Sequence, residues 1–304
     1  MMTARIRGVL TAIVTPFDAA GAVCPQRLRA QVRRQLKYEN GVFCNGTNGE
    51  FFVLNQAEKR LVTETCVNEV AGKVPMVAHI GEISTATTIR LGKDVAAMGV
   101  DAVSVITPYF VPLKQGELIR HYTAIADAVP VPVFLYNIPG RTGNTIEPAT
   151  AAKLAEHPNI VGIKDSAGSY ESLRGYLDAV KGMPDFDVLS GPDHLAHQGF
   201  LDGCSACISG LANVCPEGVS LIWKHFRDGN IEKSKAAQDF IGSLRKDLYA
   251  VAFPPAAVKK ATLLLGEDVG DSRYPFAFSE DDLAAIKQIV VKYGSASIPP
   301  EIAG

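Results

Sequence analysis

The sequence predicts an α/β protein, a (β/α)8 TIM barrel with a C-terminal helical extension. Apolar runs of four to seven residues, rich in Val, Ile, Phe and Ala, recur eight times along the chain. Such runs are typical of parallel strands buried on both faces, and strand followed by helix eight times is the order of a (β/α)8 barrel. Past residue 230 only helical patterns remain. We therefore predict a barrel with the active site in residues 1–230 and a helical appendage in residues 231–304.

The expected elements follow from periodicity and capping signals. In the first helix Val32 and Leu36 lie on one apolar stripe, Ser84 is expected to cap the third, and the fourth is expected to open at Gly116. The strands are expected at residues 9–15, 42–45, 76–80, 102–107, 131–137, 160–164, 188–190 and 206–209. Besides the third and fourth helices, helices are expected at residues 26–38, 56–70, 147–156, 170–180, 193–200, 216–228, 231–249, 255–265 and 280–293.

Composition points to a small-molecule partner. The chain has 304 residues, 47% hydrophobic and 20% charged, with a formal net charge of -2. This charge gives no general attraction to nucleic acid or to an anionic membrane. The apolar run at residues 9–14 is shorter than a secretory signal requires, and no stretch approaches the roughly 18 apolar residues of a membrane span. We expect a cytoplasmic protein.

The cysteines and histidines predict no metal centre. Six scattered cysteines suit reduced core thiols, and Cys204 and Cys207 have the spacing of half a zinc site without a second pair. His194 and His197 share a helix face with Asp193, but Asp193 is more simply a helix N-cap. His79 is expected to be a hydrogen-bonded core residue.

Lys164 is the candidate nucleophile. Barrel enzymes place their sites at the C-terminal ends of the strands, and Lys164 is the only cation among the residues that end the predicted strands. It shares a strand face with Gly162, which is expected to leave space beneath its stem. Burial disfavours the charged amine and favours the neutral form that attacks a ketone. The alternative is a strand-capping lysine that reaches solvent or pairs with Asp165.

Tyr136 ends the preceding strand at the same level. Its phenol could donate to a carbinolamine oxygen and move a proton during carbon-carbon cleavage. The turn that begins at Asn137 is expected to hold this strand end. The alternative is an aromatic plug whose hydroxyl meets water.

A glycine turn and one arginine could bind carboxylates. In residues 46–50 the glycines expose backbone N–H groups while Thr47 and Asn48 add side-chain donors, a concavity that suits the carboxylate of a 2-oxo acid. Arg141 could bind a second carboxylate through two parallel hydrogen bonds. Both features also occur without any ligand, as an ordinary turn and an ordinary loop arginine.

Other functions fit weaker signals. Ser190 with Gly191, and Ser209 with Gly210, end the last two strands, where barrels often bind phosphate. This could indicate a phosphosugar enzyme or a nucleotide-binding protein, although no run of glycines or basic residues accompanies it. A non-catalytic ligand sensor on a barrel scaffold is a further alternative.

From Gly8 to about Val290 the chain resembles the dihydrodipicolinate synthase and N-acetylneuraminate lyase superfamily of class I aldolases. The motifs are Gly-Thr-x-Gly-Glu at residues 46–50, Tyr-Asn-Ile-Pro-Gly-Arg-Thr-Gly at 136–143 and Gly-Ile-Lys-Asp at 162–165. The resemblance implies that Lys164 forms a Schiff base with pyruvate or another 2-oxo acid and that Tyr136 is the proton shuttle. It also implies a homotetramer built as a dimer of dimers, without metal or organic cofactor.

The resemblance completes the predicted site. Thr47 and Asn48 would hold the substrate carboxylate, and Ile208 would contribute a backbone carbonyl. The predicted catalytic residues are Lys164, Tyr136 and Thr47. The predicted substrate-binding residues are Gly46, Asn48, Tyr109, Arg141 and Ile208.

Two departures separate the chain from typical synthases. Phe110 follows Tyr109, where synthases carry a second tyrosine that completes a proton relay across the dimer. Asn48 replaces a threonine, as in 4-hydroxy-2-oxoglutarate aldolases. Residues 51–56 also lack the histidine of lysine-inhibited synthases, so lysine inhibition is not expected. Arg141, in contrast, matches the synthases.

These features predict a Schiff-base lyase that cleaves, condenses or dehydrates a 2-oxo acid, such as a 2-keto-3-deoxy sugar acid or 4-hydroxy-2-oxoglutarate. The main alternative is 4-hydroxy-tetrahydrodipicolinate synthase, which condenses pyruvate with aspartate semialdehyde. A deaminase or hydratase would use the same imine.

Overall fold

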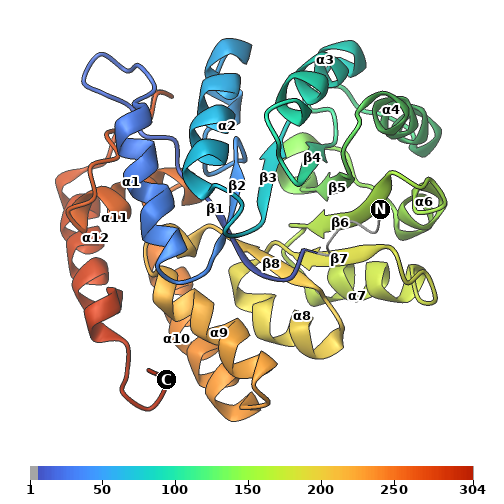
Figure 1. The fold of residues 1–304 in the computed structure, drawn as a ribbon. Coiled ribbons are helices and arrows are strands. Elements are labelled where there is room, and N and C mark those ends of the chain that lie inside the picture. Colours follow the sequence, from blue (N-terminus) through green and yellow to red (C-terminus); the bar gives the residue numbers. More distant parts are fainter. Residues whose placement is uncertain (1–5, 304) are drawn as a thin grey trace. The chain divides into compact units, whose positions relative to one another are not determined.

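A computed structural model describes residues 6–303, and its eight strands follow one another in a closed barrel (Figure 1). The registers given for the paired strands are parallel. This confirms the predicted fold class. The strands are β1 (Gly8–Ala12), β2 (Gly41–Cys44), β3 (Met76–His79), β4 (Ala102–Ile106), β5 (Val133–Asn137), β6 (Ile160–Asp165), β7 (Asp187–Ser190) and β8 (Ala206–Ser209).

Helices follow the strands as predicted, with small shifts at their ends. Residues 56–70 and 280–293 are helical as expected, and Ser84 accepts a hydrogen bond from the backbone N–H of Thr87 at the start of its helix. The α-helices are α1 (Pro25–Leu36), α2 (Gln56–Val70), α3 (Thr85–Ala96), α4 (Gln115–Ala128), α5 (Pro139–Thr142), α6 (Pro148–Leu154), α7 (Tyr170–Ala179), α8 (Ala196–Asp202), α9 (Pro216–Arg227), α10 (Ile231–Val251), α11 (Pro254–Leu264) and α12 (Glu280–Tyr293). Short 3-10 helices are η1 (Phe51–Val53), η2 (Asp193–Leu195), η3 (Leu211–Asn213) and η4 (Ser295–Ser297).

Two expectations about element ends were wrong. Asp193 caps no helix, because Pro192 precedes η2 and Leu195 precedes α8, both without a side-chain cap. The predicted first strand extended to Thr15, but β1 ends at Ala12. The backbone N–H of Val14 donates to the side chain of Asn213 at 3.0 Å. The Asn213 side chain therefore accepts the hydrogen bond of a backbone N–H that would have bonded to the neighbouring strand if β1 had continued.

The chain divides into two compact units. Among the described residues, one unit comprises 6–7 with Val77–Ile208, and the other Gly8–Met76 with 209–303. The helices beyond residue 230 therefore belong to the same unit as β1 and β2. The predicted domain boundary at residue 230 stays a prediction.

The first unit is built on four paired strands. In β4, β5, β6 and β7 the register places Ile106 beside Tyr136, Tyr136 beside Lys164 and Lys164 beside Leu189. Strand side chains are buried almost throughout, which matches the apolar runs in the sequence. Helices α3 and α4 pack together, as do α6 and α7.

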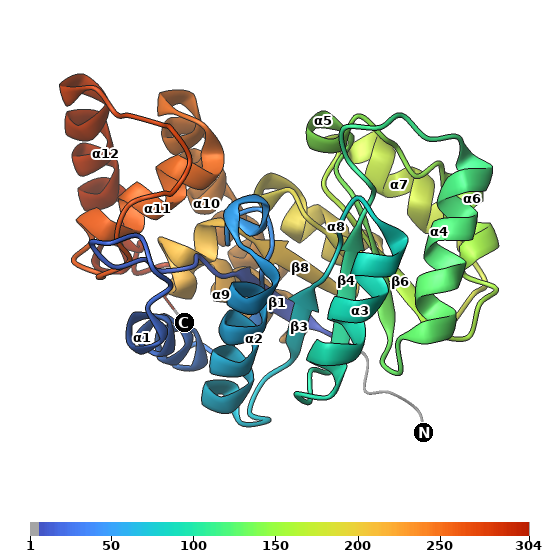
Figure 2. The ribbon, with the colours of Figure 1, turned by 90° about the horizontal axis from the view of Figure 1, so that it is seen from above.

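The second unit combines β1 and β2 with the C-terminal helices. Helix α10 packs along α9, and α10, α11 and α12 pack against one another (Figure 2). Asn213 links η3 to β1, since its side-chain amide also donates to the carbonyl of Ala12 at 2.8 Å. Within residues 6–303, no helix is both long and apolar enough to cross a membrane.

Candidate active site

Lys164 is a buried amine near the C-terminal end of β6. Its residue is 5% exposed, and its Nζ lies 3.9 Å from the centre of the Tyr136 ring. Because β5 and β6 are parallel, with Tyr136 beside Lys164, both side chains leave the sheet at the same level. The structure therefore brings together the predicted nucleophile and the predicted proton shuttle.

Asn137 and Asp165 follow these two residues and link the same strand ends. The Asn137 side-chain amide donates to Asp165 Oδ1 at 2.8 Å. The backbone N–H of Ala167 donates to the same oxygen at 3.1 Å. Burial raises the pKa of Asp165 above its usual value, although the hydrogen bond from Asn137 opposes this shift. This pair holds Tyr136 and Lys164 at one level.

The space at Gly162 has a different use from the one predicted. A Cβ atom there would lie 2.6 Å from the ring of Phe134, on the neighbouring strand. The absence of a side chain therefore makes room for the ring of Phe134 and for the backbone carbonyl of Asp187, with whose oxygen that Cβ atom would collide.

His79 is a core residue, as predicted. Its Nε2 accepts a hydrogen bond from the backbone N–H of Ile106 at 3.3 Å, and its ring meets the Tyr136 ring edge to face, with centroids 6.0 Å apart. The histidine is 1% exposed. It therefore packs behind Tyr136 and steadies that ring.

Two loops of the first unit carry Tyr109 and Arg141, and Asn144 ties them together. The Asn144 amide donates to the carbonyls of Pro108 and Val111, each at 2.8 Å. The backbone N–H of Leu113 donates back to Asn144 Oδ1 at 2.8 Å. The loop after β4 is thus fastened to the loop after β5. Sequence reasoning missed Asn144, since neither a periodicity nor a strand end marks it.

The two predicted substrate residues on these loops differ in exposure. Tyr109 is half-buried, and its hydroxyl lies 3.5 Å from Glu82 Oε2. Burial, together with the charge of Glu82, raises the pKa of Tyr109 to about 12. Its phenol therefore stays protonated near neutral pH and can donate. Arg141 lies in α5 with an exposed side chain.

In the second unit, residues 46–50 form the predicted tight turn. The backbone N–H of Glu50 donates to the carbonyl of Thr47 at 3.2 Å, and that of Phe51 donates to Gly46 at 3.3 Å. Thr15 Oγ1 donates to the carbonyl of Gly49 at 2.7 Å. These bonds close the turn and leave the side chain of Thr47 half-buried at its tip.

Asn48 lies against Gly210, in the same unit. A Cβ atom on Gly210 would lie 2.7 Å from Asn48 Nδ2, so a larger residue there would displace the Asn48 amide. Asn48 Oδ1 is buried without a hydrogen-bond partner in the described chain. A buried carbonyl of this kind is costly unless a donor reaches it. The hydroxyl or protonated group of a substrate could be that donor.

The other predicted positions, Ile208, Ser209 and Ser190, lie near the ends of β8 and β7. Ile208 is buried in β8 of the first unit. Ser209 Oγ accepts a hydrogen bond from the backbone N–H of Ala212 at 3.1 Å, and Ser190 Oγ lies 3.5 Å from the carbonyl of Pro192. Both serines thus contact the loops that follow their strands. In residues 6–303, no three His, Cys, Asp or Glu side chains gather in a way that could hold a metal ion.

The closed barrel and the buried amine beside a phenol define a class of protein: a (β/α)8-barrel lyase of the class I aldolase type. The family model that matches is the dihydrodipicolinate synthetase family, over residues 5–292. The chain belongs to this family.

Relatives of known sequence and solved structures are similar to nearly the whole chain. A 4-hydroxy-tetrahydrodipicolinate synthase of Geobacter sp. strain M21 is 36% identical over 292 residues, covering 94% of this chain and 98% of the relative. The chloride-inhibited dihydrodipicolinate synthase from Acinetobacter baumannii, complexed with pyruvate, aligns with a TM-score of 0.90 at 32% identity, covering 95% and 99% of the two chains. YagE, a prophage protein from E. coli K12 in complex with pyruvate, aligns with a TM-score of 0.91 at 30% identity, with the same coverage.

Proposed function

We propose that Lys164 forms a Schiff base with the carbonyl carbon of a 2-oxo acid. The observation that carries this proposal is the 5% exposed amine with its Nζ 3.9 Å from the centre of the Tyr136 ring. Only the neutral form of an amine attacks a carbonyl carbon, and a phenol beside the amine can exchange the proton that the reaction moves. Pyruvate in the solved structures of two relatives supports a ligand of this class.

The iminium that forms on Lys164 is the electron sink of the reaction. The neutral amine of Lys164 adds to the ketone carbon and forms a carbinolamine, which loses water to give an iminium. In the cleavage direction, the bond to the hydroxyl-bearing carbon breaks and its electrons move toward the iminium nitrogen. The hydroxyl gives up its proton, the aldehyde leaves, and an enamine remains. Protonation of the enamine and hydrolysis of the imine return pyruvate and the free lysine.

The other residues have roles that follow from their chemistry. The Tyr136 hydroxyl moves the proton for carbinolamine and carbon-carbon steps. Thr47, Gly46 and Asn48 bind the carboxylate of the 2-oxo acid through donors of their turn, and the carbonyl of Ile208 accepts a hydrogen bond from the substrate. Tyr109 and Arg141 bind the distal part of the substrate, where a guanidinium can hold a carboxylate with two hydrogen bonds.

The substrate we favour is a hydroxylated 2-oxo acid, a 2-keto-3-deoxy sugar acid or 4-hydroxy-2-oxoglutarate, which the enzyme cleaves or dehydrates. Phe110 supports this choice: it is 93% exposed and carries no proton to transfer. The unpaired, buried Asn48 Oδ1 adds support, since it suits a substrate that brings a donor. We further propose a cytoplasmic homotetramer, a dimer of dimers, that needs no metal or organic cofactor.

A second candidate is 4-hydroxy-tetrahydrodipicolinate synthase. The name of the Geobacter relative favours it, and so does Arg141 at the position where synthases hold the carboxylate of aspartate semialdehyde. In this case the enamine of pyruvate attacks the aldehyde, a new carbon-carbon bond forms, and the proton goes to the former aldehyde oxygen.

Trapping tests the proposed imine. The protein is incubated with pyruvate and borohydride, and we expect a stable adduct with loss of activity. Lys164→Arg is the matched control, because arginine keeps the positive charge but offers no amine for an imine. An adduct that forms equally on Lys164→Arg would exclude Lys164 as the nucleophile.

Turnover separates the two candidates. Purified enzyme is assayed with 4-hydroxy-2-oxoglutarate, with 2-keto-3-deoxy sugar acids, and with pyruvate plus aspartate semialdehyde. We expect a kcat/KM on a hydroxylated 2-oxo acid at least about tenfold above that for the condensation, a difference of about 1.4 kcal/mol in transition-state binding. The reverse order would establish the synthase.

A further inference from the structure

A cavity lies in the second unit among the C-terminal helices. Its volume is about 310 Å3, close to the lower limit for pockets that bind small molecules. It is lined by residues of α11, of the segment before α12 and of α12 itself, and by none of the predicted active-site residues. Those used in the argument are Lys260, Asp271, Ser272, Phe276, Phe278 and Leu283.

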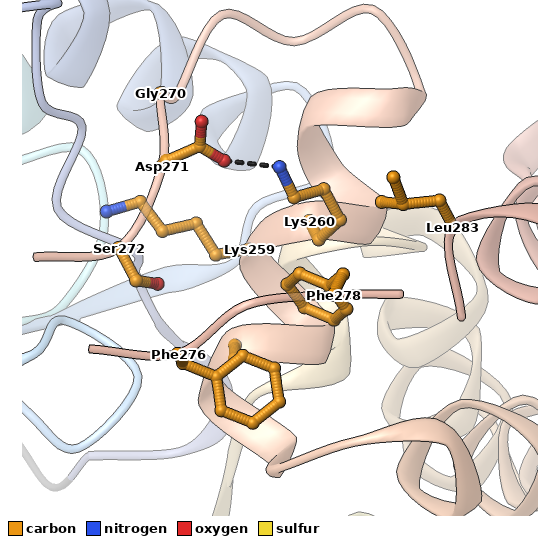
Figure 3. A pocket seen from close by; sticks show the side chains of 9 residues that line it. Lys259, Lys260, Gly270, Asp271, Ser272, Phe276, Phe278 and Leu283 are labelled. Carbon is orange, nitrogen blue, oxygen red and sulfur yellow. Dashed lines mark hydrogen bonds and ion pairs between the residues drawn. The ribbon is translucent and has the colours of Figure 1, made fainter. Parts of the chain in front are cut away.

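Lys260 gives the cavity a positive group. Its side chain is 16% exposed and pairs with Asp271, whose side chain is 74% exposed (Figure 3). An ion pair with one exposed partner contributes little stability. The hydrogen bond to Asp271 uses one of the three N–H donors of the ammonium group. A carboxylate that enters the cavity can therefore bind Lys260 while Asp271 moves toward solvent.

Two aromatic rings give the cavity an apolar wall. Phe276 and Phe278 meet edge to face with centroids 5.0 Å apart, and Phe276 is 38% exposed. The ammonium of Lys260 lies 5.6 Å from the centre of the Phe278 ring, and Leu283 contributes an aliphatic side. Figure 3 shows these rings on one side of the cavity and the Lys260–Asp271 pair on another. A ligand that fits is a small carboxylic acid with an aromatic or branched apolar body.

The walls of this cavity also hold Glu50, which ends the 46–50 turn. Lys259, next to Lys260 on α11, donates to Glu50 Oε1 at 2.7 Å with both side chains almost fully buried. Arg273, which follows Asp271 and Ser272 along the chain, donates its backbone N–H to Glu50 Oε2 at 3.1 Å. Each oxygen of this carboxylate is therefore held by one wall.

Gly270 fixes the position of the wall that contains Asp271. Its φ is +67°, and a Cβ atom there would collide with the backbone carbonyl of Phe17. Gly270 therefore anchors the start of this segment. A ligand that displaces the Asp271 side chain from Lys260 acts on residues 271–273, whose far end holds Glu50 through the backbone N–H of Arg273.

We propose that this cavity is an effector site for a small apolar or aromatic carboxylic acid, coupled through Glu50 to the 46–50 turn. Glu50 adopts a left-handed backbone conformation, with φ 58°, and its N–H closes the turn on Thr47. Small shifts of Glu50 therefore change the turn that carries Thr47 and Asn48. The effect on substrate binding rests on the proposed function, whereas the binding site itself does not.

Calorimetry with three probes tests the binding site. Phenylacetate carries both a carboxylate and a ring, phenylacetamide lacks the charge, and acetate lacks the ring. We expect phenylacetate to bind at least about tenfold more tightly than either, which corresponds to about 1.4 kcal/mol. Equal affinities for the three probes would contradict a site that needs both features.

Variants locate the binding. Lys260→Met and Phe276→Ala are expected to weaken phenylacetate at least about tenfold, and Asp271→Asn to tighten it because a competing carboxylate is removed. Lys287→Met, an exposed lysine on α12, is the matched control and leaves the affinity unchanged. Lys164→Arg is expected to bind phenylacetate with the affinity of the wild type. Normal binding by Lys260→Met would overturn the proposal.

Coupling is read from the KM for the 2-oxo acid substrate. Phenylacetate is expected to change KM at least about fivefold in the wild-type enzyme and not in Lys260→Met, a coupling at the lower end of the usual range. If trapping at Lys164 succeeds but phenylacetate does not bind, the effector site is wrong and the proposed function stands. If trapping fails but the binding pattern holds, the site stands and the proposed function is wrong.

Discussion

Two lysines with similar surroundings differ in the group that each amine meets. Lys164 Nζ lies 3.9 Å from the centre of the Tyr136 ring, and Lys259 Nζ lies 3.8 Å from the centre of the Phe17 ring. Both residues are buried, at 5% and 1% exposure. Lys259, however, donates to Glu50 at 2.7 Å, and its ring has no hydroxyl. Burial against a ring therefore does not by itself make a lysine a nucleophile.

A lowered pKa does not by itself identify the nucleophilic lysine either, as Lys259 shows. Burial lowers the pKa of Lys259 to about 8, although the charge of Glu50 raises it. A lowered pKa is a common sign of a catalytic lysine. Here the amine is held in a buried ion pair, whose removal leaves an uncompensated charge. A neighbour that can exchange a proton, such as Tyr136, distinguishes the two sites.

The largest expected effect is on chemistry at Lys164. Lys164→Arg is expected to lose at least about 1,000-fold in kcat/KM, because arginine cannot form the imine. Steady-state assays on the best substrate measure this loss, and thermal unfolding shows whether the variant is folded. A folded variant that kept more than a tenth of the activity would remove the difference between the two lysines.

Lys259→Met is expected to act on stability instead. Breaking a buried ion pair costs about 3–5 kcal/mol, since Glu50 is left charged without its partner. Urea denaturation measures the change in the free energy of unfolding. The double variant Lys259→Met with Glu50→Met should recover part of the loss. A single variant as stable as the wild type would show that the pair does not hold the turn.

Tyr136→Phe separates imine formation from proton transfer. The ring packing on Lys164 and His79 is retained, but the hydroxyl is lost. We expect kcat to fall about 100-fold, the lower end of the range for a general acid or base. Borohydride trapping at Lys164 should still succeed after longer incubation. Unchanged kcat would assign the proton to another group.

The smallest expected effect is the pH dependence of stability that arises from His121, a buried base. Burial lowers the pKa of His121 to about 4, and its Nδ1 lies 2.8 Å from Thr85 Oγ1. The unfolded chain has the usual histidine pKa and binds a proton that the folded protein excludes. Stability is therefore lost as the pH falls from about 6.5 toward 4. Between pH 7 and pH 5 we expect a loss of about 2 kcal/mol.

The control for this effect is His121→Asn, which keeps a polar group beside Thr85 but does not titrate. Denaturation curves at the two pH values should show a smaller loss in this variant than in the wild type. Equal losses would show that another group accounts for the pH dependence. Comparing the wild type with His121→Asn therefore isolates the loss of stability that burial of this histidine causes at low pH.

The barrel and half of the site could be predicted because they follow from regular geometry. Apolar runs of strand length have a two-residue side-chain period, so Tyr136 and Lys164 were expected at one level of neighbouring strands. The register of β5 and β6 confirms this. Asn137 was also expected to hold the strand end, and its hydrogen bond to Asp165 does so.

The rest depends on contacts between distant parts of the chain. Lys259 and Glu50 are 209 positions apart, and Asn144 reaches carbonyls 33 and 36 positions earlier. No periodicity marks such pairs, because each depends on where a loop returns. Gly162 was misinterpreted for the same reason, since the space that it leaves is filled by Phe134 of the neighbouring strand.

The most direct test of this account is a lysine-by-lysine map of the adduct formed with pyruvate and borohydride. Peptide mass spectrometry compares Lys164 with Lys259, which is equally shielded from solvent. We expect the adduct on Lys164, with Lys259 unmodified. An adduct on Lys259, or none on Lys164, would contradict the claim that a buried amine beside a phenol performs the chemistry.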